Sequence, residues 1–257
     1  MERFLLRFIK ESKVKDIDEP KFLNKAVLEF PGTVISSLEK ETKYLFENAI
    51  YEIVSHSVNL HRNEIESGLK SKKLIKKSKA DFDINVRDLY AHKVKTIYGK
   101  ILEYATRAQT DLNLNKEENK RISEIKIANR KMVEIIRDVK ELRRNIIKYG
   151  DSDNKYIRHE YNVFRRRIVK VLRAIIQLKF DENIEATNKV LLGMRNTAIN
   201  ASKKGNKNIN NLIRNHLITN YMASSLVNDH ENLNDMIKKL LEVGELLYGE
   251  KDSILEP

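Results

Sequence analysis

The sequence predicts an all-α fold of six long helices, and three observations lead to this prediction. Chain breakers are scarce, with 8 Gly and 3 Pro in 257 residues, which favours long helices over a turn-rich β-sandwich. Apolar residues make up 41% of the chain, enough for a hydrophobic core. They recur every three or four positions over long stretches, which is the period of an amphipathic helix.

The first half of the chain predicts a connector and three helices. Residues 1–33 form the connector, because Pro31-Gly32 stops an earlier helix and Thr33 can cap the next one. The Lys-rich run that ends at Lys79 is expected to be a loop. The three helices are expected over residues 34 to about 66, from Asp81 or Asp83 to about 112, and from Asn113 or Asn115 to Gly150, where Gly150 suits the left-handed C-terminal position.

The second half predicts three further helices, with Gly205 as the stop between the last two. They are expected from about 155 to 179, from Asp181 to Lys204, and from Asn206 or Asn208 to Tyr248. Long helices joined by short loops fold back on their neighbours, because each apolar stripe needs a partner. We therefore expect two consecutive antiparallel three-helix bundles, over residues 34–150 and 151–257.

Composition and motifs exclude several functions. The chain has no Cys, which excludes thiolate zinc sites, iron–sulfur ligation and Cys nucleophiles. No apolar run reaches the ~18 residues that suggest a membrane span. The sequence also shows no Gly-rich phosphate loop and no nucleophile motif. We expect a cytoplasmic, non-enzymatic protein.

The formal net charge of +12 is concentrated in two clusters. Such clusters bind phosphate backbones or anionic lipid head groups, although they also fit a solvated loop and a solvated helix face. No nucleic-acid motif accompanies them, so a membrane surface or another anion is the better candidate. The candidate contact residues are Lys72, Lys73, Lys76 and Lys77 in the first cluster, and Arg165, Arg166 and Arg167 in the second.

Three carboxylates lie at apolar seams of the predicted helices. Glu134 and Asp138 are four residues apart and share one helix face. Asp229 takes a position that the three-four pattern of the last helix would give to an apolar residue. A carboxylate at a seam must pair with a cation, bind a metal or raise its pKa. These residues are therefore candidate metal ligands, or partners of Lys or Arg from a neighbouring helix.

Two short segments around these acids resemble the motif E-R-I-G-D-H of the PhoU family of phosphate-uptake regulators. They are Glu134-Ile-Ile-Arg-Asp138 and Ser225-Leu-Val-Asn-Asp229-His230, the second with Ser in place of Glu. The segment from Lys21 to Pro31 is similar to the linker between the last membrane helix of bacterial sodium/phosphate cotransporters and their cytosolic PhoU-like domain.

This resemblance implies a PhoU-like regulatory domain at the cytoplasmic face of the bacterial inner membrane. Its partner would be the transmembrane half of a sodium/phosphate cotransporter, in the same chain when full-length, or another phosphate transporter. It further implies a homodimer by analogy and a weakly bound divalent cation (Fe, Zn, Mn or Mg). The alternatives are a free-standing PhoU-type regulator that binds a transporter or kinase and, less favoured, a helical nucleic-acid-binding protein.

Overall fold

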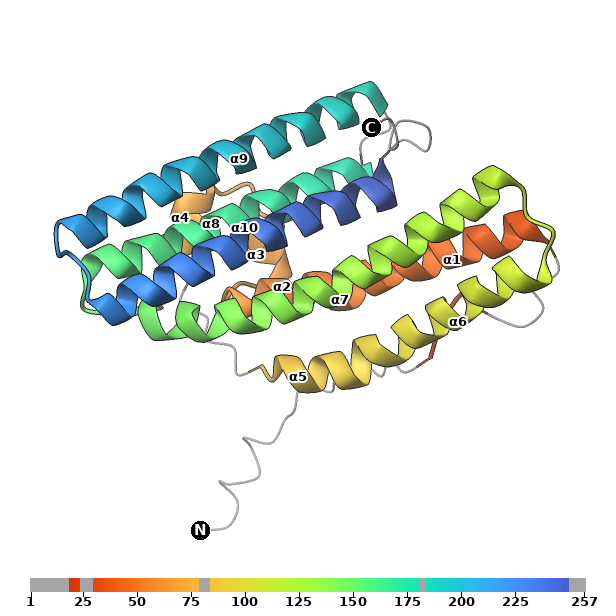
Figure 1. The fold of residues 1–257 in the computed structure, drawn as a ribbon, viewed down its shortest axis with the longest axis horizontal. Helices are drawn as coiled ribbons and strands as arrows, with labels where there is room; N and C mark the ends of the chain where they lie inside the picture. The colour runs from red at the N-terminus through yellow and green to blue at the C-terminus, as the bar shows by residue number, and fades with distance from the viewer. Residues whose placement is uncertain (1–18, 24–29, 79–83, 181–183, 250–257) are drawn as a thin grey trace, which may run out of the picture.

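The computed structural model describes residues 19–23, 30–78, 84–180 and 184–249, and it confirms the all-α prediction (Figure 1). Helices dominate these ranges, and no β-strand occurs within them. No helix in the same ranges combines the length and the hydropathy that a membrane crossing needs. Most of the predicted connector, residues 1–18 and 24–29, lies outside the described residues.

The first predicted helix begins earlier and ends sooner than expected. Helix α1 starts at Pro31 with Phe30 as its N-cap, so the predicted cap at Thr33 was wrong. Pro suits the first helical position because the first N–H of a helix has no intrahelical partner. The helix continues through a π-helical turn and ends near Ser57, not near 66. Its segments are α1 (Pro31–Leu45), η3 (Phe46–Ile50) and α2 (Tyr51–Ser57).

Asn59 explains this early end. Its φ is 55°, a left-handed conformation that Asn tolerates better than most residues. The N–H of Asn59 donates to His56 O, and the N–H of Leu60 donates to Ser55 O. This pattern is a Schellman motif, which closes a helix by satisfying its last carbonyls. A short helix, α3 (Arg62–Glu66), follows the turn.

The predicted Lys-rich loop is partly helical. Helix α4 (Ser71–Lys77) carries the buried side chains Leu74 and Ile75 and packs against α8. The loop prediction was therefore wrong for this part, because two apolar residues among the lysines give the segment a face to bury. Residues 79–83, which include the predicted caps Asp81 and Asp83, lie outside the described residues.

The second and third predicted helices are present. Asn85 caps a helical stretch of α5 (Val86–Leu89), η4 (Tyr90–Val94) and α6 (Lys95–Asp111). Asn115 caps α7 (Lys116–Gly150) in a capping box with Glu118, as one of the two predicted caps. Gly150 ends α7, but no described Gly has a positive φ, so its predicted left-handed role was wrong. The predicted apolar stripe of α7 is buried: Ile122, Ile125, Ala128, Met132, Ile135, Val139, Leu142 and Ile146.

The last three helices are α8 (Lys155–Phe180), α9 (Ile184–Arg214) and α10 (Asn220–Tyr248). Gly205 lies inside α9, so the predicted stop there was wrong. A Cβ atom at Gly205 would lie 2.2 Å from Cε1 of His230 on α10. The glycine therefore permits close packing of two helices. The chain turns instead at His216, with φ 52°, and Thr219 caps α10.

The long helices contact one another in two sets of three (Figure 1). In the first set α1, α6 and α7 pack together, and in the second α8, α9 and α10 do so. Helices α7 and α10 run antiparallel along each other and form the main contact between the sets, which we call the α7–α10 seam. Helices α3 and α4, although early in the chain, pack on α8 of the second set.

Candidate functional site at the α7–α10 seam

Glu134 and Asp138 lie on the seam, where a lysine from α10 faces both of them. The Lys239 Nζ atom is 2.6 Å from Asp138 Oδ2 and 3.8 Å from Glu134 Oε2. The Arg130 guanidinium, one turn before Glu134 on α7, is 3.6 Å from the Glu134 carboxylate. The two acids are thus paired with cations of the same chain, one of which comes from the neighbouring helix.

This arrangement does not fit a divalent metal ion. Hard cations such as Mn²⁺ or Mg²⁺ need several oxygen ligands, whereas here two carboxylates share one ammonium group. Among the described residues no three His, Cys, Asp or Glu side chains gather closely enough to hold a metal ion. The third predicted ligand, Asp229, is engaged elsewhere on the seam. The predicted cation stays a hypothesis, and no chemistry is derived through it.

Asp229 forms a buried hydrogen-bond network that links three helices. Its Oδ2 atom accepts a hydrogen bond from Tyr161 OH on α8 at 2.6 Å and one from Asn145 Nδ2 on α7 at 2.8 Å. The Tyr161 ring stacks on Tyr149 with centroids 5.0 Å apart. Burial raises the pKa of the Asp229 carboxyl, while the two hydrogen bonds act to lower it.

A polar cavity of about 290 Å³ opens beside Asp229. Helix α7 contributes Glu141, Arg144 and Asn145, and α10 contributes several Ser and Asn side chains, among them Ser225. Ser225 is the residue that stands where the PhoU motif has Glu. Amide, hydroxyl and carboxylate groups around so small a space can hold a polar ligand by hydrogen bonds. Within this lining we find no arrangement of nucleophile and base.

Arg165 is a structural residue and does not belong to a surface cluster. It is 8% exposed. Its Nε donates to Val58 O at 2.8 Å, and a terminal nitrogen lies 3.3 Å from both Asn59 O and Ser78 Oγ. The prediction of a membrane or anion contact was therefore wrong for Arg165, because its guanidinium is used to close the end of α2 against α8. Arg173 acts similarly: it donates to the carbonyls of Ile65, Ser67 and Leu69.

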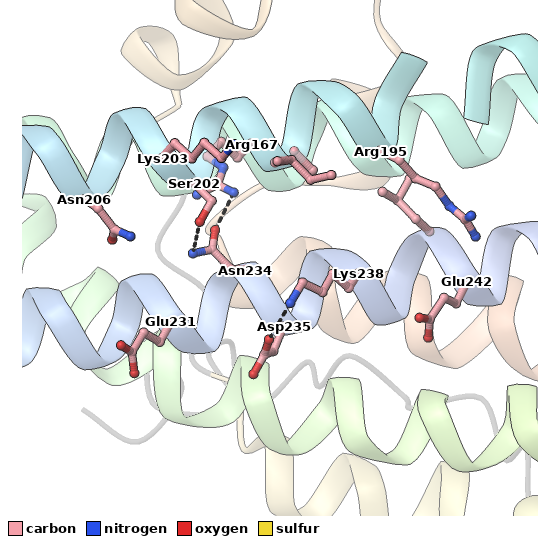
Figure 2. A pocket seen from close by; sticks show the side chains of 13 residues that line it. Arg167, Arg195, Ser202, Lys203, Asn206, Glu231, Asn234, Asp235, Lys238 and Glu242 are labelled. Carbon is pink, nitrogen blue, oxygen red and sulfur yellow. Dashed lines mark hydrogen bonds and ion pairs between the residues drawn. The ribbon is translucent and has the colours of Figure 1, made fainter. Parts of the chain in front are cut away.

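Arg167 is also engaged within the fold. Figure 2 shows its guanidinium donating to Asn234 Oδ1 on α10 at 2.6 Å, while Asn234 Nδ2 donates to Ser202 Oγ on α9 at 2.8 Å. Burial lowers the pKa of the Arg167 guanidinium to about 10. Arg167 therefore connects the three helices of the second set.

The pocket drawn in Figure 2 lies between α9 and α10 and measures about 740 Å³. Its charges are of both signs and several are paired within the chain. Lys238 Nζ lies 3.3 Å from Asp235 Oδ1, and Glu242, also on the lining, forms an ion pair with Lys131 of α7. Neutralised charges give this pocket little preference for one class of ligand.

The remaining predicted basic residues divide between a groove and an exposed helix face. Arg166 and Lys72 line a groove between α8 and α9, described further below. Lys73, Lys76 and Lys77 are exposed on α4, on the side away from Leu74 and Ile75. Their exposure leaves them accessible, and the contact with an anionic surface stays a prediction.

No protein-family model, no curated protein and no solved structure matches this chain.

Proposed function

We propose that this chain is a non-enzymatic, PhoU-like regulatory domain of a sodium-dependent phosphate cotransporter. It acts at the cytoplasmic face of the bacterial inner membrane, on the transmembrane half of the same protein or on another phosphate transporter. The proposal rests on the motif resemblance together with one observation. The two motif copies, around Asp138 and Asp229, lie on the third helix of each set of three, and these helices pack along one shared seam.

The contacts of the seam support a role as one docking unit. Asn232 of α10 donates to Asp138 O at 3.0 Å, and Lys131 of α7 pairs with Glu242. Such cross-links let the two helix sets move together as one unit. A regulatory unit of this kind would dock on a transporter in one state more strongly than in another, and a signal would have to bind the two states differently to shift their balance.

An immunoblot of the native host tests where the protein acts. Cells are separated into membrane and soluble fractions and probed with an antibody against residues 34–249. A membrane band much larger than 30.1 kDa supports a transporter-linked domain. A soluble band near 30.1 kDa instead supports the free-standing regulator and removes the same-chain transporter from the proposal.

Phosphate uptake tests the regulatory part of the proposal. A host strain with an in-frame deletion of the codons for residues 34–249 is compared with its parent for sodium-dependent uptake of labelled phosphate, before and after phosphate excess. We expect uptake to persist but to lose its response to excess. An unchanged response, with the deletion verified, would reject the regulatory role.

Calorimetry with Mn²⁺, Fe²⁺ and Zn²⁺ tests the cation hypothesis separately. Wild-type protein is compared with Asp138→Ala and with Lys239→Met, which removes the ammonium group facing the two acids. Because Lys239 occupies the space between them, we expect wild type to give no binding heat. Saturable heat in wild type that Asp138→Ala abolishes would establish the metal site.

A further inference from the structure

A groove of about 770 Å³ lies between α8 and α9, with the start of α4 at its edge. We call it the basic groove, because six Lys or Arg side chains line it and Glu160 is the one Asp or Glu on its lining. The size is that of sites that enclose small molecules. The cations are Arg166, Arg167 and Lys170 from α8, Lys204 and Lys207 from α9, and Lys72 from α4.

None of these six cations forms an ion pair with a described carboxylate. Arg167 differs from the rest only in that its guanidinium donates to the neutral amide of Asn234. The other five form no ion pair and no hydrogen bond with any described residue. Glu160 is 4% exposed, and Asn208 Nδ2 donates to it at 2.5 Å. Burial raises the pKa of its carboxyl, while the charge of Arg166 acts to lower it. One carboxyl cannot balance six cations, so the lining keeps a positive excess.

The positive potential of the basic groove is visible at His159 on its lining. Burial lowers the pKa of this imidazole, and the neighbouring cations Arg166 and Lys72 lower it further. Like charges on one lining repel one another, and a bound anion would relieve this repulsion. The same cations on a flat surface would attract counterions only weakly.

The floor of the basic groove holds a buried histidine with an unused nitrogen. His230 of α10 is 1% exposed, and its Nε2 lies 3.1 Å from the carbonyl oxygen of Ser202. Because a carbonyl only accepts, Nε2 carries the proton and Nδ1 is an acceptor in the neutral ring. Nδ1 has no hydrogen-bond partner among the described residues. Gly205 leaves room for this ring, because a side chain at position 205 would place its Cβ atom against the His230 imidazole.

We propose that the basic groove binds a small anion with two or more phosphate groups, held by Arg166 and Lys170 from one wall and Lys204 and Lys207 from the other. Lys72 closes the edge of the site, and the His230 ring lies beneath it on the same lining. Cations on both walls and the volume of the groove favour an anion with several phosphate groups over a single orthophosphate. This inference goes beyond the regulatory role proposed above and does not depend on it.

Calorimetric titration with inorganic tripolyphosphate, at constant ionic strength, tests the site in the full chain. Lys170→Gln/Lys204→Gln removes one cation from each wall. Lys95→Gln/Lys120→Gln is the matched control, since it removes the same charge from exposed positions of α6 and α7. We expect saturable binding in wild type, a Kd at least about tenfold weaker in the groove variant, and little change in the control.

Histidine ring nitrogen resonances give a second measurement in the same titration. The Nδ1 resonance of His230 should shift in wild type and remain in place in the groove variant, whose unchanged helical spectrum verifies folding. Equal weakening of both double variants, equal competition by sulfate, or no tripolyphosphate binding would overturn the proposal.

Two further arms separate other sources of phosphate. Binding to phosphatidylglycerol vesicles, compared with phosphatidylcholine vesicles, tests for a lipid surface. Binding to a duplex oligonucleotide tests for nucleic acid. Binding that appears only in one of these arms would overturn the small-anion site in favour of that partner. Tripolyphosphate binding that persists without vesicles or duplex supports it.

Discussion

At the α7–α10 seam the chain supplies partners for its own charges, whereas in the basic groove it leaves them open. Asp138 faces Lys239, and Asp229 accepts hydrogen bonds from two buried side chains. In the groove, Lys170 and Lys204 meet no carboxylate of the described chain. The two regions lie in one structure and share α10, so the difference is local. Charges with internal partners stabilise the fold, and charges without them are available to a ligand.

The most damaging substitution is expected at Asp229. Asp229→Ala leaves the Tyr161 hydroxyl and the Asn145 amide without their shared acceptor inside the protein, which should lower the free energy of unfolding by about 3 kcal/mol. Asp235→Ala is the matched control on the same helix, because Asp235 is exposed and its ion pair is with Lys238 one turn away. We expect a loss within about 0.5 kcal/mol there. Urea unfolding measures both, and equal losses would contradict the structural role of Asp229.

Two adjacent arginines give the next largest contrast. Arg165→Gln removes hydrogen bonds to the carbonyls that end α2, and we expect a loss of about 2 kcal/mol in unfolding free energy. Arg166→Gln changes a groove cation with no such bonds, so the expected loss is under about 0.5 kcal/mol. Tripolyphosphate binding should show the reverse order among the folded variants. If Arg166→Gln proved the more destabilising change, the division between structural and open charges would fail.

The helices were largely predictable, because the spacing of apolar residues in the sequence alone marks the face of each helix that is buried. Every residue of the α7 stripe read from the sequence is buried, and α8 ends within one residue of its predicted limit. Two kinds of boundary were missed. Asn59 ends a helix without Gly or Pro, because Asn tolerates the left-handed conformation of the closing turn. Gly205 does not end one, because it lies where α9 packs closely against His230 of α10.

The candidate sites were less predictable, since a sequence shows charges but not their partners. Arg165 and Arg166 are neighbours in the chain, yet they point in different directions on α8. One signal existed: Arg165 lies four residues after Tyr161 and four before Val169, which places it in the buried register. Lys239 and Asn145 offered no comparable signal, because only the antiparallel packing of α7 and α10 sets them opposite the acids.

Gly205 permits a smaller test of how tightly α9 packs. Gly205→Ala places a Cβ atom 2.2 Å from the His230 ring, so we expect a loss of about 1.5 kcal/mol from overpacking. Gly193→Ala in the same helix meets no atom within 4 Å. There the higher helix propensity of Ala should stabilise the protein by about 0.5–1 kcal/mol. Thermal unfolding compares the pair. Stabilisation by both would mean that α9 does not hold His230 closely.

The smallest expected effect is a pH dependence at Asp229. Because burial raises its folded-state pKa above the unfolded value of 3.8, the native state takes up this proton at a higher pH than the unfolded state. Stability from this group is therefore greatest below the unfolded pKa and falls as pH rises through the folded pKa. Asp229→Asn cannot titrate and keeps an oxygen that accepts from Tyr161 and Asn145. We therefore expect the difference in unfolding free energy, wild type minus Asp229→Asn, to increase as pH is lowered from neutral. A difference that decreases would mean that the two hydrogen bonds outweigh burial, so that the seam favours the ionised carboxylate.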